Sequence, residues 1–200
     1  MTTAMASRTK RAVTGGGVVA ALAALALFLF GSGNALAADK ALTFSGEFPL
    51  IGKQQVSTVV HVDIPATATP GQTVSVPFSI DVDSGAAAAD GLRLVGATKI
   101  SGSIKAASVV TLSDGQSVSI PVELPIAETP VPATGPLTFT AEGSVDFTVP
   151  TGVAAGDATV SVDPAAVSHI VTDSSLGEFD VNLSLDPTDQ DTTLGTTTVG

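Results

Sequence analysis

The sequence predicts an all-β fold, an antiparallel sandwich of two packed sheets. Apolar and polar residues alternate over several stretches, and this period of two is typical of strands with one buried face. Turn-forming residues separate these stretches, and only one stretch has a helical pattern. Strands spaced by about 8–12 residues with turns between them are typical of a sandwich.

Alternation is clearest in three segments, 73–82, 118–124 and 179–185, where every second side chain is apolar. Further strands are predicted at 42–48, 56–64, 99–106, 137–141, 145–149, 158–162, 167–171 and 193–199. Two of the strands contain a proline, Pro77 and Pro121, which cannot donate a hydrogen bond to a ladder. We therefore expect these strands to be edge strands or to be bulged at the proline.

The remaining segments predict one helix and several turns. The stretch 86–95 has a helical pattern, and Ser84 precedes it as a candidate N-cap. Four prolines in 125–136 predict an extended connection. Turn signals lie between the strands, at 70–71, 114–115, 134–136, 151–152 and 155–157. We expect these elements to form one sandwich of the immunoglobulin-like kind.

The first 37 residues predict a secretory signal peptide that forms a helix. A basic patch (Arg8, Lys10, Arg11) precedes an apolar run at 18–30, and Ala35-Leu36-Ala37 is a cleavage site of small residues. A membrane-spanning helix needs about 20 apolar residues, more than this run supplies. We therefore expect cleavage after Ala37 and one secreted or cell-surface domain at 38–200. The alternative, an uncleaved membrane anchor, stays open.

Charge and composition exclude several partners and chemistries. Residues 38–200 carry five basic and 19 acidic side chains, a net charge of −14, which phosphate backbones repel, so nucleic acid is excluded as a partner. The chain has no Cys, so thiolate catalysis, Cys-ligated metals and disulfides are excluded. It also has no Trp or Tyr, which argues against an aromatic sugar-binding platform.

Three segments of the chain, 42–52, 130–137 and 181–194, carry a family resemblance. Residues 42–52 read LTFSGEFPLIG, which resembles the opening of a secreted actinobacterial domain family of unknown function, of the 6801 type, whose members begin with Leu-Thr-Tyr-x-Cys-x-Phe-Pro-Leu-Ile-Gly. Residues 181–194 resemble the closing Cys-x-Leu-Asp-Pro segment of the family, and residues 130–137 resemble its proline-rich link. The resemblance implies an exported β-domain and implies no reaction.

By this resemblance, the two Cys positions of the family fall on Gly46 and Leu183. Their joint absence here is what we expect if the two cysteines pair with each other in other members. The resemblance therefore implies that Gly46 and Leu183 lie side by side in the core. A glycine facing a leucine would fill the space of two joined cysteines, and both residues fall on the apolar face of their predicted strands.

No catalytic or cofactor-binding residue is predicted. The two histidines, His61 and His169, have no nucleophile motif around them and are expected at the surface or at strand edges. Asp81, Asp83 and Asp90 are weak candidates for calcium ligands, because Asp81-Val82-Asp83 is similar to the start of a calcium loop.

The full calcium loop pattern is incomplete, because the twelfth position holds Leu92 where the pattern needs Glu. A second acidic cluster, formed by Asp186, Asp189 and Asp191, is a weaker candidate. We expect no cofactor other than, at most, calcium.

These observations predict a non-enzymatic module for binding or structure, with an unidentified protein or cell-envelope partner. Contact with a membrane is expected only through an uncleaved signal segment. Two alternatives stay open. One is a hydrolase that uses a pair of carboxylates, which would have to meet in a cleft. The other is a subunit of a surface assembly built by strand addition.

Overall fold

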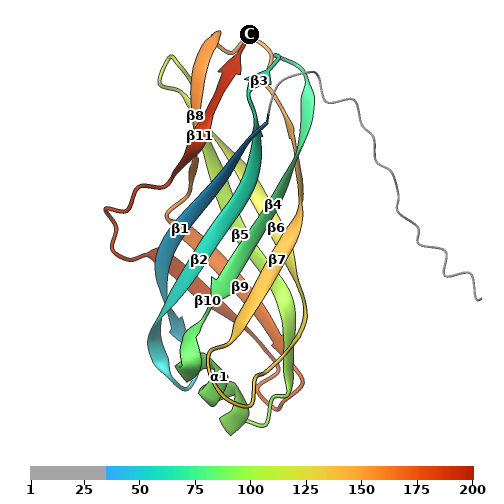
Figure 1. The fold of residues 1–200 in the computed structure, drawn as a ribbon, viewed down its shortest axis with the longest axis vertical. Coiled ribbons are helices and arrows are strands. Elements are labelled where there is room, and N and C mark those ends of the chain that lie inside the picture. Colours follow the sequence, from blue (N-terminus) through green and yellow to red (C-terminus); the bar gives the residue numbers. More distant parts are fainter. Residues whose placement is uncertain (1–34) are drawn as a thin grey trace, which may run out of the picture. The chain divides into compact units, whose positions relative to one another are not determined.

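The computed structural model describes residues 35–200, which contain eleven β-strands and one α-helix (Figure 1). The described residues belong to one compact unit, Ser32–Gly200. The elements, in chain order, are β1 (Ala35–Phe48), β2 (Gly52–Pro65), β3 (Thr67–Ala68), β4 (Thr73–Asp83), α1 (Gly85–Leu94), β5 (Lys99–Thr111), β6 (Ser117–Pro130), β7 (Thr138–Thr148), β8 (Gly156–Val162), β9 (Ala165–Thr172), β10 (Glu178–Leu185) and β11 (Thr193–Val199).

The all-β prediction is confirmed, but the predicted immunoglobulin-like sandwich is wrong. The strands pair in the order β5, β6, β7, β4, β2, β1, β10 and β9, and β9 pairs again with β5. This ring closes an eight-stranded antiparallel barrel, whereas a sandwich would need two separate sheets. Alternation of apolar and polar residues reports only that one face is buried, and that face is the same in both architectures.

The barrel closes where β5 meets β9, and a glycine makes this contact feasible. Ile100 and Gly102 flank a register shift in β5, and Gly102 has a φ of 146°. A Cβ atom on Gly102 would overlap the carbonyl oxygen of His169 on β9. Only glycine therefore allows the two backbones to approach this closely.

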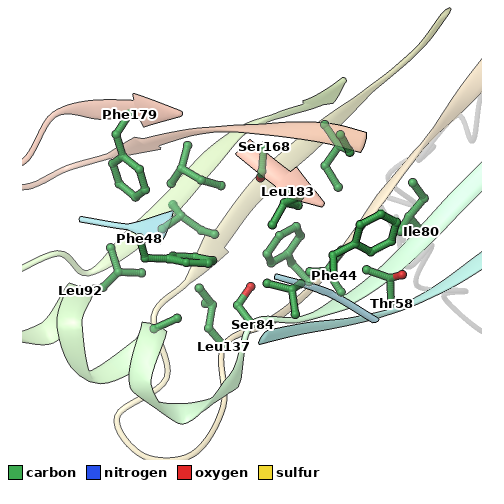
Figure 2. Close-up of a pocket in the computed structure, with 18 of the residues that line it drawn as sticks. Phe44, Phe48, Thr58, Ile80, Ser84, Leu92, Leu137, Ser168, Phe179 and Leu183 are labelled. Atoms are coloured by element: carbon green, nitrogen blue, oxygen red, sulfur yellow. The ribbon is translucent and has the colours of Figure 1, made fainter. Parts of the chain in front are cut away.

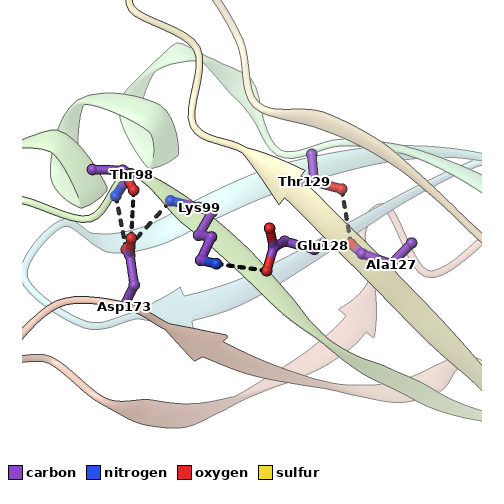
Figure 3. Close-up of polar contacts among 6 residues, drawn as sticks. All are labelled: Thr98, Lys99, Ala127, Glu128, Thr129 and Asp173. Atoms are coloured by element: carbon purple, nitrogen blue, oxygen red, sulfur yellow. Dashed lines mark hydrogen bonds and ion pairs between the residues drawn. The ribbon is translucent and has the colours of Figure 1, made fainter.

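Side-chain hydrogen bonds fasten β5 at the same junction (Figure 3). Asp173, directly after β9, accepts hydrogen bonds from the backbone N–H of Thr98 at 2.8 Å and from the Thr98 hydroxyl. On the other side of β5, the Lys99 ammonium bonds Glu128 of β6 at 2.7 Å. The Thr98 bonds lower the pKa of Asp173, and Glu128 raises the pKa of Lys99.

The two ends of the barrel differ in their covering elements (Figure 1). The helix α1 lies at one end, called the helix end. At the other, C-terminal end, β5 pairs with β8 over residues 108–111, and β11 pairs with β8 and with β3. The barrel interior therefore continues past the β5–β9 junction.

One ladder of the ring is nearly absent. Among the described residues, β6 and β7 are bridged only at Ile126 and Ala141. From there towards Ser117, β6 pairs only with β5, and Pro121 lies in this stretch, as expected for an edge. We call the facing stretches 117–125 of β6 and 143–148 of β7 the β6–β7 seam. Pro77 on β4 pairs with Ser144, just beyond the last β2–β4 pair.

The predicted helix is confirmed as α1, although Ser84 does not cap it with its side chain. The Asp83 carboxylate instead accepts a hydrogen bond from the backbone N–H of Gly85 at 2.8 Å. The predicted extended connection at 125–136 is a strand over its first half, because β6 continues to Pro130. Within residues 35–200, no helix combines the length and the apolar character that crossing a membrane requires.

The predicted signal peptide lies outside the described residues except for its last three, which begin β1. Ala35 to Ala37 pair with Asp63 to Pro65 of β2. Cleavage after Ala37 would remove these three pairs and leave the remaining eleven residues of β1 in register, starting with Ala38 opposite Val62.

Gly46 and Leu183 are direct partners in the β1–β10 ladder, which confirms the juxtaposition implied by the family resemblance. A Cβ on Gly46 would lie 2.8 Å from a terminal methyl carbon of Leu183 and 2.7 Å from Val181. Leu183 is 8% exposed. The leucine side chain therefore occupies the space that the glycine leaves.

Candidate functional site

The helix end of the barrel encloses an apolar cavity of about 80 Å³ (Figure 2). Strands β1, β2, β4, β5, β7, β9 and β10 contribute inward-facing side chains, and α1 covers the end. Alternation places these side chains inside, as in β2, where Val56, Thr58 and Val60 are all buried. We call this space the helix-end cavity.

Aromatic side chains form much of its wall. Phe44, Phe48, Phe139 and Phe179 all line the cavity. Figure 2 shows Phe48 and Phe179 near Leu92 on one side of the cavity. Large flat rings of this kind give a ligand an extensive apolar contact surface.

Three hydroxyl groups are set among these apolar side chains, those of Thr58, Ser84 and Ser168. All three residues are buried. The Thr58 hydroxyl donates to the carbonyl of Leu42 at 3.2 Å. Figure 2 shows the hydroxyls of Ser84 and Ser168 directed towards the cavity from opposite sides. An apolar pocket with a few polar groups that fix orientation is typical of a small-molecule site.

The β1–β2 turn and α1 form the cover of the cavity. Ile51 of the turn packs on Gly91 of α1, where an added Cβ would lie only 2.9 Å from the Ile51 side chain. Leu50, next to it, has a φ of 71° and is 63% exposed. Glycine inside a helix is destabilising by about 1 kcal/mol relative to alanine, so its place here reflects the close contact with the turn.

His61 lies outside the barrel, between two carboxylates on neighbouring strands. Its ring nitrogens contact Asp39 of β1 at 2.7 Å and Asp81 of β4 at 3.2 Å. These hydrogen bonds raise the pKa of His61. The pKa of Asp81 is lowered, first by the hydrogen bond from Thr140 at 2.6 Å and then by that of His61.

His169 likewise lies on an outer strand face, as expected, and contacts Asp180 of β10 at 2.7 Å. Its other ring nitrogen is 3.8 Å from Glu178. Neither histidine lines the helix-end cavity. The structure thus pairs both histidines with carboxylates on the surface and brings neither to a nucleophile in the interior.

The three weak calcium candidates have separate partners. Asp81 bonds His61 and Thr140, Asp83 accepts from the N–H of Gly85, and Asp90 pairs with Arg93. Within residues 35–200, no group of three or more His, Cys, Asp or Glu side chains is placed to hold a metal ion. The structure therefore does not gather these candidates.

The second acidic cluster fastens the β10–β11 connection to the barrel. Asp186 pairs with Lys53 at 3.1 Å, and Asp191 pairs with Lys40 at 2.6 Å. The pKa values of both carboxyls are lowered, chiefly by these lysines. Asp189 is exposed in the same connection.

The helix-end cavity and its cover were not predicted from the sequence. The inward positions of each strand were visible as alternation, but their convergence depends on ring closure, which alternation does not report. Gly91 inside the predicted helix was the one local signal of the close contact between α1 and the turn.

Comparison with known proteins identifies the family of the chain. No curated protein and no solved structure matches it. A family model described as a family of unknown function (DUF6801) matches residues 43–195, from β1 into β11. The match includes the last six residues of β1, the other seven strands of the ring and both members of the Gly46–Leu183 pair. Because it covers well over half of the sequence, the chain belongs to this family of unknown function, DUF6801.

Proposed function

We propose that this protein is an exported, non-enzymatic binding module that holds a small apolar ligand in the helix-end cavity. The observation that carries the proposal is the enclosed apolar space of about 80 Å³ beneath α1. An eight-stranded barrel has an interior just wide enough to be filled by side chains or to hold one small ligand. Side chains leave the helix-end cavity unfilled, which favours the binding of a small ligand.

The size and lining of the cavity define the class of ligand. An apolar cavity of about 150 Å³ binds benzene, so a cavity of about half that volume accepts the end of an alkyl chain or a small ring once the cover moves. No lysine, arginine or histidine lines the cavity. A charged group would be buried without a partner, which is strongly unfavourable. The ligand is therefore neutral where it is enclosed.

The non-enzymatic part of the proposal rests on the chemistry of the lining. None of the residues that line the cavity is titratable, so no general acid or base faces its interior. The proposed binding also needs no metal or other cofactor. The proposal that the protein is exported rests on the sequence of residues 1–37. Cleavage after Ala37 would keep Asp39 in β1, and with it the contact between Asp39 and His61.

A dye titration tests the proposal. N-phenyl-1-naphthylamine is neutral and apolar, its phenyl ring is the part small enough to enter the cavity, and its emission rises in an apolar site. The chain has no Trp or Tyr to interfere with that emission. Ala166 lines the cavity opposite Leu183, so Ala166→Leu should fill the space and weaken dye binding. Ala165→Leu is the matched control, because Ala165 is exposed on the other face of β9.

We expect saturable binding by the native protein and by Ala165→Leu, and at least roughly tenfold weaker binding by Ala166→Leu, since the added side chain takes the place of ligand contacts. Equal affinity in all three proteins, or no saturable binding by the native protein, would contradict the proposal. Circular dichroism establishes that both variants remain folded.

A further inference from the structure

A second apolar cavity, of about 90 Å³, lies at the C-terminal end of the barrel. Its lining is apolar except for two residues with hydroxyl groups, Ser108 on β5 and Thr197 on β11. It borders the helix-end cavity without sharing lining residues, so it constitutes a separate space. We call it the C-terminal cavity.

The Thr197 hydroxyl is the one unpaired polar group of this lining. Thr197 is 9% exposed, and its Oγ1 is buried without a hydrogen-bond partner among the described residues. The Ser108 hydroxyl, by contrast, donates to the carbonyl of Ser161 at 3.2 Å. Buried hydroxyls in native proteins are normally paired, so the Thr197 hydroxyl needs a partner. No polar atom is exposed at the cavity surface, so Thr197 presents carbon atoms there, and a rotation about χ1 is needed to bring its hydroxyl to the place of the methyl group at the cavity wall.

A water molecule does not meet this requirement. A buried water is held by about two to four polar groups. The C-terminal cavity offers only one unpaired group, since its other side chains are apolar and Ser108 is engaged. A partner for Thr197 must therefore gain most of its binding free energy from apolar contacts.

The β6–β7 seam gives access to this cavity from the side. Four lining side chains at the seam, Val118, Ile120, Val145 and Phe147, are only partly buried. No ladder pairs join these stretches of β6 and β7, so the strands can separate there without losing backbone hydrogen bonds to each other. In the strand order β8 and β5 separate β11 from the seam, so Thr197 is buried away from the opening, where the partly buried apolar side chains lie.

We propose that the C-terminal cavity is a second binding site, for a neutral amphiphile with one hydroxyl or carbonyl group. The polar group of this ligand pairs with the Thr197 hydroxyl, and its apolar part lies among Val118, Ile120, Val145 and Phe147 at the seam. A charged head group does not fit, because no basic side chain lines the cavity. This inference goes beyond the proposed function, because it concerns a different cavity and a ligand with a defined polar group.

Two small probes, 1-hexanol and n-hexane, test the role of Thr197. They have the same chain length and differ in the hydroxyl. Titrations of the secreted protein are followed by methyl NMR, with Val118 and Val145 reporting on the C-terminal cavity and Ile104 and Leu183 on the helix-end cavity. We expect 1-hexanol to shift Val118 and Val145.

The variant Thr197→Val keeps the shape of the side chain and removes the hydroxyl. We expect it to weaken 1-hexanol roughly two- to tenfold, the value of one neutral hydrogen bond, and to leave n-hexane unchanged. Thr197→Ser keeps the hydroxyl and should retain the preference for 1-hexanol. Thr196→Val is the matched control, because Thr196 is exposed on the outer face of the same strand.

The unliganded proteins provide a second measurement that does not depend on a ligand. Because Thr197→Val removes an unpaired buried hydroxyl, it should melt at or above the native temperature. A lower melting temperature than Thr197→Ser would show that the hydroxyl is paired within the protein and would overturn the proposal. The proposal would also be overturned if Thr197→Val weakened the binding of 1-hexanol and n-hexane equally, or if the probes shifted only the methyl signals of Ile104 and Leu183. Shifts of Ile104 and Leu183 alone would still be consistent with the proposed function of the helix-end cavity.

Discussion

Replacing Gly46 and Leu183 singly and together measures how closely β1 packs on β10. Leu183→Ala removes a side chain that is 8% exposed and should cost about 2–5 kcal/mol through the cavity it leaves. Gly46→Ala should cost about 1–3 kcal/mol, because the new Cβ would lie 2.8 Å from the backbone oxygen of Asn182. A backbone atom cannot rotate away, so the strands themselves must shift.

The double variant tests whether these two effects share one space. The Cβ that Gly46→Ala adds would also lie 2.8 Å from the Leu183 side chain, and Leu183→Ala removes that contact. We therefore expect the double variant to lose less stability than the sum of the single losses, by about 0.5–3 kcal/mol. Urea unfolding followed by far-ultraviolet circular dichroism gives the three free energies.

Leu185→Ala is the matched control for this cycle. Leu185 is 4% exposed and lies on the same strand, but it pairs with Phe44 and is not among the atoms nearest to Gly46. Gly46→Ala and Leu185→Ala should therefore be additive to within about 0.5 kcal/mol. If Gly46→Ala and Leu183→Ala are equally additive, the reciprocal packing of Gly46 and Leu183 is refuted.

A disulfide between the same positions tests their distance directly. In Gly46→Cys plus Leu183→Cys, the bond would close a loop of roughly 140 residues, for which chain entropy predicts about 5 kcal/mol of stabilisation. Crowding of the Cβ at position 46 destabilises the oxidised and reduced forms alike and so does not change the difference between them. The oxidised form should therefore be about 5 kcal/mol more stable than the reduced form, less any strain in the bond. Two titratable thiols persisting in the folded, oxidised sample would contradict the pairing.

Three further predictions concern closure, pH and processing. Gly102→Ala should destabilise the barrel by at least about 2 kcal/mol, because a Cβ there collides with the carbonyl of His169 and the φ is unfavourable for alanine. If urea unfolding shows a loss of stability below about 0.5 kcal/mol, the close contact of β5 and β9 is absent. The pKa of His61 is raised in the folded protein, so the stability that its protonated ring contributes is complete below the unfolded pKa of about 6.5 and is lost as the pH rises through the folded pKa. The melting temperature of His61→Gln should therefore vary less with pH above about 6.5 than that of the native protein. If the melting temperatures of the two proteins change in parallel over this range, the raised pKa of His61 is refuted. N-terminal sequencing of the exported protein should read Ala38-Asp39-Lys40, and a product that retains residues 1–37 would contradict cleavage after Ala37.

The strands could be predicted from the sequence because each depends on its own alternation. In β10, Phe179, Val181, Leu183 and Leu185 face inwards whatever lies across the barrel. The closure of the ring depends instead on which strands pair, and the edge of β5 away from β6 has two partners, β9 over its first half and β8 over its second. Gly102 marks the junction, but a single glycine in a strand indicates only a bulge or a close backbone approach, without naming the partner.

The two cavities could not be predicted from the sequence for a related reason. The helix-end cavity is lined from seven strands of the ring, and the orphaned hydroxyl of Thr197 becomes visible only when every neighbour is known. In the sequence, Thr197 stands in a run of three threonines, 196–198, in which nothing distinguishes the buried one. The pairing of Gly46 with Leu183 was predictable because it came from the family resemblance, which carries information about contacts that alternation lacks.

The distribution of backbone pairing gives the two cavities separate routes of access. Consecutive inward positions divide them, with Val60 lining the helix-end cavity and Val62 the C-terminal cavity on β2. At the helix end α1 and the β1–β2 turn cover the cavity, and a ligand that enters there must displace this cover. At the C-terminal end the unpaired seam gives lateral access. A bulky substitution at Gly91 should therefore alter the rate of binding to the first cavity and leave the rate of binding to the second unchanged.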